Sequence, residues 1–246
     1  MDNLENVCEC ECGCECTERE VKSSSLFQRK MLGVLCGLLA PACVLLGMIG
    51  SENNLDGWYL SISATYYASS KICMIGLLFS AAVFFLSYIF EGYDWRDKAM
   101  SIIQAAGCLG VVVFPCRTPG APETVGMFNL PIDISNIVHT ASACVLFIAF
   151  GVNIMFLFTL GHADSNVMKR KRNRVYRVCG SVIFAFCVIQ ALTATPVFDW
   201  VPAWFPLTWL NEFVMLVAFS VAWLVKAEMF SSLNDKSDMD RKPAMR

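Results

Sequence analysis

Charged side chains and histidine are scarce in this sequence. Asp, Glu, Lys and Arg make up 16% of its 246 residues, and only two histidines occur, His139 and His162. They lie 23 positions apart on one predicted helix, so about 35 Å of helix separates them and they cannot share a metal. A catalytic zinc site takes about three protein ligands. The histidine content therefore argues against a zinc hydrolase.

Motifs of common catalytic sites are absent as well. The chain has no HExxH pair, no serine-centred elbow and no glycine-rich phosphate loop. Its first thirty residues are polar and acidic, without the short apolar core and small-residue cleavage site of a signal peptide. We therefore expect the first apolar segment to act as the insertion signal, and we do not expect conventional enzymatic chemistry.

Long apolar runs are the dominant feature of the chain. A spanning helix needs about 20 mostly apolar residues, and within the six runs of that kind Glu212 and His139 are the only acid and base. Because lipid offers the backbone no hydrogen bonds, each run must be helical. The sequence predicts an all-α membrane bundle of six transmembrane helices, at about 31–50, 72–90, 99–116, 134–161, 178–198 and 207–225.

The basic residues predict the orientation of this bundle. If both termini are cytoplasmic, only Lys71 and Arg117 of the 19 Lys and Arg lie outside, as the positive-inside bias requires. The basic inner loop from Lys169 to Arg177 then faces the inner leaflet, where we expect anionic lipid as a partner. The pattern does not indicate nucleic acid. We expect one membrane domain at 29–230 between disordered cytoplasmic tails at 1–28 and 231–246.

The first tail has an unusual composition, in which cysteine alternates with glutamate or glycine. Soft thiolates at this density are suited to Zn²⁺ or Cu(I), although zinc sites normally space a pair by two to four residues. Cysteines near a first span are also candidates for S-acylation. A low-complexity tail without a dedicated role is the third reading. No other cofactor is expected, and the thiols concerned are Cys8, Cys10, Cys12, Cys14 and Cys16.

Polar residues near the outer ends of the predicted helices are the best indicators of function, because each is costly in lipid unless it has a partner or faces a cavity. Counted from the helix ends, several lie at one depth and form a candidate ligand-binding layer. The alternative is a set of hydrogen bonds that hold the helices together. The layer and the first outer loop contribute His139, Glu212, Gln190, Thr193, Asn211, Asp133, Arg117, Ser61, Ser63 and Thr65.

Several short motifs occur in a characteristic order along the apolar part of the chain. They are the outer-loop segment 59–65, the segment 111–115, the segment 137–139 and the segment 211–213. In order, spacing and membrane side this chain resembles the six-span damage-regulated autophagy modulator (DRAM) family and its relatives of unknown function. The resemblance covers roughly residues 30–230 and implies six helices with both termini cytoplasmic. The segment of alternating cysteines has no counterpart in that family.

These patterns predict a multi-pass integral membrane protein that is lipid-linked and without conventional enzymatic chemistry. We expect it to bind or organise membrane lipid, or to modulate membrane traffic, through the outward-facing polar layer. A small transporter or channel is the alternative. An intramembrane lipid hydrolase, with His139 and Glu212 as an acid–base pair, is the third reading.

Overall fold

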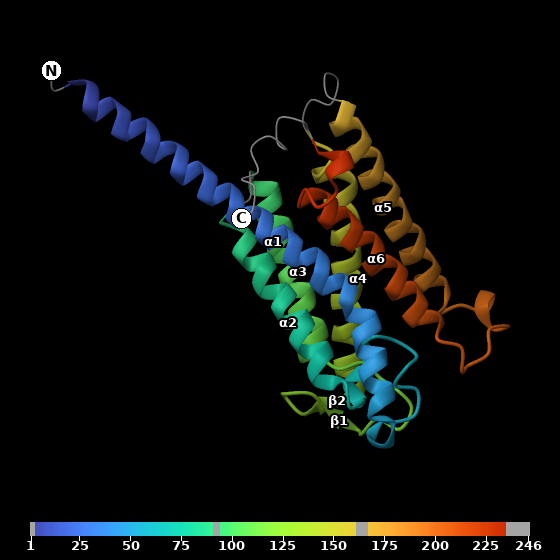
Figure 1. The fold of residues 1–246 in the computed structure, drawn as a ribbon. Helices are drawn as coiled ribbons and strands as arrows, with labels where there is room; N and C mark the ends of the chain where they lie inside the picture. Colours follow the sequence, from blue (N-terminus) through green and yellow to red (C-terminus); the bar gives the residue numbers. More distant parts are fainter. Residues whose placement is uncertain (1–2, 91–93, 161–166, 235–246) are drawn as a thin grey trace.

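The computed structural model describes the backbone of residues 3–90, 94–160 and 167–234, and the side chains in these ranges from residue 24 onward. Within them the chain forms an all-helical bundle (Figure 1). The α-helices are α1 (Asn3–Ile49), α2 (Lys71–Tyr88), α3 (Trp95–Val113), α4 (Ile132–Val152), α5 (Val167–Leu192) and α6 (Leu207–Lys226). A single π-helical turn, Asn153–Leu157, continues α4.

Five of these helices are long and apolar enough to cross a membrane, which makes the chain a multi-pass membrane protein. They are the Ser24–Ile49 part of α1, α2, α4 with its π-helical turn, α5 and α6. The helix at the third predicted span is not among these five. This helix, α3, carries Arg96, Asp97 and Lys98 in its first turn, so its uncharged part is short.

The two ends of α3 follow from local sequence. Asp94 has an extended backbone and its carboxylate accepts a hydrogen bond from the backbone N–H of Trp95, 2.7 Å away, as an N-cap. The helix therefore begins at Trp95, four residues before the predicted span. The helix ends at Val113 rather than at 116, because Pro115 disfavours helical geometry at the preceding Phe114.

The helices form a closed ring in chain order. Each one packs against its neighbours in the sequence, and α6 packs back against α1. Successive helices run in opposite directions (Figure 1). We call the end of the ring where α1 ends and α2 begins the outer end, after the side that the charge pattern predicts for it.

Aromatic side chains fill the middle and the inner half of the ring. Phe150 of α4 and Phe219 of α6 lie closest, with ring centroids 3.9 Å apart. Phe85 of α2 and Trp223 of α6 complete the contact, and all four are buried. Burial of large apolar side chains at this density is the main source of packing energy in the bundle.

Small residues close the ring between α1 and α6. The hydroxyl of Ser220 donates a hydrogen bond of 2.7 Å to the carbonyl oxygen of Gly33. A Cβ on Gly37 would lie 2.6 Å from the Ser220 Oγ, so this close approach requires glycine. Small residues of this kind let transmembrane helices pack with their backbones in contact.

Two short structures cover the outer end. Residues 51–70, which we call the plug segment, contain the 3-10 helices Ser51–Asn53 and Ser63–Tyr67. The connection from α3 to α4 contains a small antiparallel hairpin of β1 (Thr124–Val125) and β2 (Leu130–Pro131), with Val125 opposite Leu130. The hairpin and the plug segment lie at the same end of the bundle in Figure 1.

The first helix is longer than the sequence predicts. The backbone of residues 3–28, for which we expected a disordered tail, continues α1 and projects beyond the other helices (Figure 1). The side chains of the five cysteines between positions 8 and 16 lie outside the described residues. So does most of the predicted second tail, of which the described part contains the 3-10 helix Ser231–Leu233.

Candidate functional site

The predicted polar layer divides into separate groups of residues at the outer end. Asn211 and Glu212 show the reason, since adjacent positions on a helix point about 100° apart. Asn211 contacts α5, whereas Glu212 contacts the plug segment. Residues at the same height along the bundle therefore bond to different partners.

Glu212 holds the plug segment to the ring. Its Oε2 accepts a hydrogen bond of 2.6 Å from the backbone N–H of Ile62, the residue that precedes the 3-10 helix Ser63–Tyr67. Close to this contact in the sequence of both segments, the backbone N–H of Trp209 donates to the carbonyl oxygen of Leu60 over 3.0 Å. The start of α6 and the plug segment are therefore joined by two hydrogen bonds.

The three predicted residues of the plug segment serve its local structure. The Ser61 hydroxyl accepts a hydrogen bond from the N–H of Ala64, and the Thr65 hydroxyl donates to the carbonyl of Ile62. Ser63 and Thr65 are buried. Nearby, the Tyr67 hydroxyl donates to the carbonyl oxygen of Cys116 over 2.9 Å. Burial raises the pKa of the Tyr67 phenol above its ordinary value, so it remains a donor at neutral pH.

A small cavity lies inside the ring, beneath the plug segment. The cavity has a volume of about 30 Å³. This is room for roughly one or two water molecules and far less than a lipid chain needs. Its walls are apolar apart from Ser63 and Glu212 and two thiols. The lining residues are Cys36, Leu39, Ile62, Ser63, Leu78, Cys108, Val111, Ala143, Leu146, Phe147, Phe150, Glu212 and Leu216.

A second group of polar residues joins α5 to α6. The amide of Asn211 donates a hydrogen bond of 2.9 Å to the Oε1 of Gln190. The amide nitrogen of Gln190 lies 3.4 Å from the Thr193 hydroxyl and 3.3 Å from the Thr208 hydroxyl. The sequence placed Gln190, Thr193 and Asn211 together, and Thr208 completes the group.

A third group joins α4 to the end of α3. The Nδ1 of His139 lies 2.6 Å from the carbonyl oxygen of Phe114. Because a carbonyl only accepts, Nδ1 carries the proton. Ser135 donates to the carbonyl oxygen of Pro115 over 2.8 Å. Among the described residues, the pair between His139 and Glu212 that the sequence suggested is not present, because each has a different partner.

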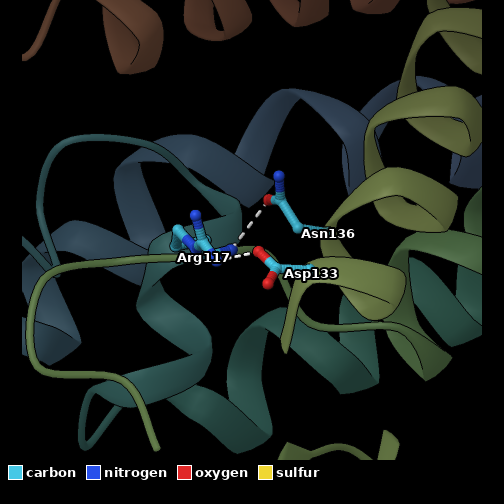
Figure 2. A network of polar contacts seen from close by, with 3 residues as sticks. All are labelled: Arg117, Asp133 and Asn136. Atoms are coloured by element: carbon cyan, nitrogen blue, oxygen red, sulfur yellow. Dashed lines mark hydrogen bonds and ion pairs between the residues drawn. The ribbon is translucent and has the colours of Figure 1, made fainter. Parts of the chain in front are cut away.

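The fourth group is exposed, and Figure 2 shows it. The Arg117 guanidinium forms an ion pair with the Asp133 carboxylate in the first turn of α4, and the backbone N–H of Arg117 donates to the Oδ1 of Asn136 over 2.8 Å. The Arg117 side chain is 56% exposed and that of Asp133 is 70% exposed. The sequence placed both residues at the outer end, but it did not indicate Asn136.

Exposed apolar side chains lie at the same end of the bundle. Ile134 and Ile137 come from the same turns of α4 as Asp133 and Asn136, and Ile137 is 68% exposed. Met127 and Phe128 lie at the tip of the hairpin, between β1 and β2, and are 77% and 61% exposed. The outer end therefore carries both a charged pair and exposed apolar side chains.

Two deeper polar residues join α3 to α4. Gln104 is fully buried and donates from its amide nitrogen to the carbonyl oxygen of Ala149 over 3.3 Å. Asn153, which begins the π-helical turn, donates to the Oε1 of Gln104 over 3.4 Å. Their contacts are those of helix packing.

Within the part of the chain whose side chains are described, no group of three or more His, Cys, Asp or Glu is arranged to hold a metal ion. The Zn²⁺ or Cu(I) site predicted for Cys8 to Cys16 lies outside that part and stays a prediction. No family model matches the chain, and neither a curated protein nor a solved structure matches it. The resemblance to the DRAM family likewise stays a prediction from sequence.

Proposed function

We propose that the chain is a six-span membrane protein that binds membrane lipid at its outer end. The observation that carries this proposal is the exposed ion pair of Arg117 and Asp133, at the same end of the bundle as exposed apolar side chains of α4 and the hairpin. The proposed ligand is a phospholipid with a zwitterionic headgroup. Its phosphate would contact the guanidinium and its amine would contact the carboxylate.

The ion pair is suited to exchange its internal contact for a ligand. An exposed salt bridge contributes only about 0–1 kcal/mol to stability, because water screens both charges. Replacing it by two contacts to a zwitterionic headgroup therefore costs the fold little. Ile134 follows Asp133 in α4 and Ile137 lies one turn after it, and these exposed side chains offer a surface for the acyl chains.

Six spans with both termini cytoplasmic are part of the same proposal. The packing of α3 between α2 and α4 supports a crossing by this helix too, because a helix that packs alongside two spanning helices lies at the same depth in the membrane as they do. The charge distribution supports the orientation, with only Lys71 and Arg117 at the outer end. This orientation places the ion pair at the outer leaflet.

The lipid proposal is tested by analysing the lipid that stays with the protein. The protein is purified in mild detergent, and native mass spectrometry identifies bound phospholipid. Arg117→Gln and Asp133→Asn each remove one of the two headgroup contacts, so both variants should retain much less zwitterionic phospholipid. Glu123→Gln removes a charge from the same connection without touching the pair and is the matched control. Equal retention by all four proteins would contradict the proposal.

The orientation is tested with inserted epitopes. An epitope after residue 122 should be reached by antibody in intact cells or sealed vesicles of outer-side-out orientation, and an epitope after residue 240 should be protected until the membrane is permeabilised. Detection of both on the same side would mean an even number of crossings between them and would contradict the three that the proposal requires.

A further inference from the structure

Two cysteines flank the plug segment in the sequence. Cys43 lies two turns before the end of α1, and Cys73 is the third residue of α2. Cys43 is fully buried, Cys73 is half-buried, and both are free thiols in the structure. A covalent link between them would join α1 to α2 and would close the plug segment into a loop that is fixed at both ends.

The register of α1 against α2 places the two cysteines at one level. The helices pack side by side and run in opposite directions (Figure 1). At the outer end, the hydroxyl of Ser69 donates a hydrogen bond of 3.4 Å to the carbonyl oxygen of Leu46. Cys43 lies three residues before Leu46, and Cys73 lies four residues after Ser69. One helical turn inward along both chains therefore leads from this hydrogen bond to the two thiols.

The two backbones approach closely at this end of the ring. A Cβ on Gly50 would lie 2.3 Å from the Cβ of Ser69 and 3.8 Å from its Cα. The Cβ atoms of bridged cysteines lie about 3.5–4.5 Å apart, so the end of α1 and the residues before α2 are as close as a disulfide requires. The side-chain contact between the thiols of Cys43 and Cys73 agrees with this register.

We propose that Cys43 and Cys73 form a disulfide bond, the plug bridge, by exchange with a small-molecule disulfide. The thiolate of Cys73, the more accessible of the two, attacks one sulfur of the reagent and displaces its other half as a thiol. The thiolate of Cys43 then attacks the Cys73 sulfur, completes the protein disulfide and displaces the second half. The two protons of the protein thiols end on the two released thiols, so one reagent disulfide is reduced for each bridge formed.

This proposal differs from general oxidation of accessible thiols. General oxidation follows exposure and would select Cys144, whose side chain is exposed, before the buried Cys43. A bridge depends on how two thiols are paired. The proposed orientation places the pair on the extracytoplasmic side, where disulfides persist. The pairing itself follows from the helix register and depends neither on that orientation nor on the lipid proposal.

The experiment maps the disulfides of the full chain after oxidation. The purified protein in mild detergent is treated with oxidised glutathione, the remaining thiols are blocked with N-ethylmaleimide, and the protein is digested with trypsin. Cleavage after Lys30, Lys71 and Arg96 places the two cysteines on separate peptides, 31–71 and 72–96. We expect mass spectrometry to find these peptides linked in most molecules, and dithiothreitol to release them.

Variants identify the partners and test the effect on stability. Cys43→Ala should abolish the linked peptide, whereas Cys36→Ala, on the same peptide, and Cys144→Ser should leave it unchanged. The oxidised protein should melt at a higher temperature than the reduced one, because the bridge restricts the unfolded chain, and Cys73→Ser should remove this difference even if Cys43→Ala does not fold. Absence of the linked peptide, its persistence in Cys43→Ala, or a link from Cys73 to Cys116 instead would overturn the proposal.

Discussion

Replacing Glu212 tests whether this carboxylate holds the plug segment in place. Glu212→Leu removes the acceptor for the N–H of Ile62, a residue that is only 4% exposed. A buried donor left without a partner costs about 1–3 kcal/mol. Glu212→Gln keeps an acceptor oxygen at the same position and should cost less.

The loss should appear as local opening of the outer end before global unfolding. Cys116 is a suitable reporter, because its thiol is buried and lies near Ser61 of the plug segment and near Glu212. A membrane-impermeant maleimide is added to the detergent-solubilised protein, and peptide mass spectrometry follows labelling at each cysteine. An opening cost lower by about 1–3 kcal/mol accelerates labelling of Cys116 roughly 5- to 140-fold.

The pattern over three proteins decides the outcome. Glu212→Leu should label fastest at Cys116, Glu212→Gln should lie between it and the unchanged protein, and labelling of the deeply buried Cys36 should be slow in all three. Equal labelling of Cys116 in the three proteins would refute a role for the carboxylate in holding the plug segment. Faster labelling of Cys36 in step with Cys116 would show instead that the whole bundle is destabilised.

Three further predictions concern packing. In a double-mutant cycle of Gln190→Leu and Asn211→Leu, unfolding in detergent should show a coupling of about 0.6–1.7 kcal/mol from their hydrogen bond, and additive effects would reject the contact. Gly180→Ala should destabilise by about 1–3 kcal/mol, because its Cβ would lie 2.7 Å from the Met155 Cβ, whereas Gly76→Ala, with no atom within 4 Å, should be neutral or slightly stabilising. Phe150→Ala should cost about 3–5 kcal/mol in thermal or denaturant unfolding, and a loss below 1 kcal/mol would show that the aromatic cluster repacks.

Sequence predicted the helical class and most helix positions, because in lipid an apolar run of this length can satisfy its backbone hydrogen bonds only as a helix. The end of α6 agrees to within one residue, at Lys226 against a predicted 225. The helical backbone of residues 3–28 was not predicted, because composition gave no apolar face to indicate it.

The partners of the candidate site residues could not be predicted from sequence. Counting residues from a helix end predicts only the height of a side chain along the helix axis, and the structure pairs Arg117 with Asp133 at one end of the bundle. The partner of a side chain depends on rotation about the helix axis and on which helix lies beside it. Both are set by packing, so the separation of Glu212 from His139 required the folded ring.

The ring in chain order also constrains how the protein is made. Five of its six interfaces join helices that follow one another in synthesis, so each forms as soon as the second helix has been inserted. The sixth, where Ser220 meets Gly33 and Gly37, joins the first helix to the last. Until α6 leaves the ribosome, the glycine face of α1 has no partner, and a chain truncated before residue 207 retains an open ring. A nascent protein of this design therefore keeps the glycine face of α1 open to membrane chaperones until α6 is inserted, and completing the chain covers it.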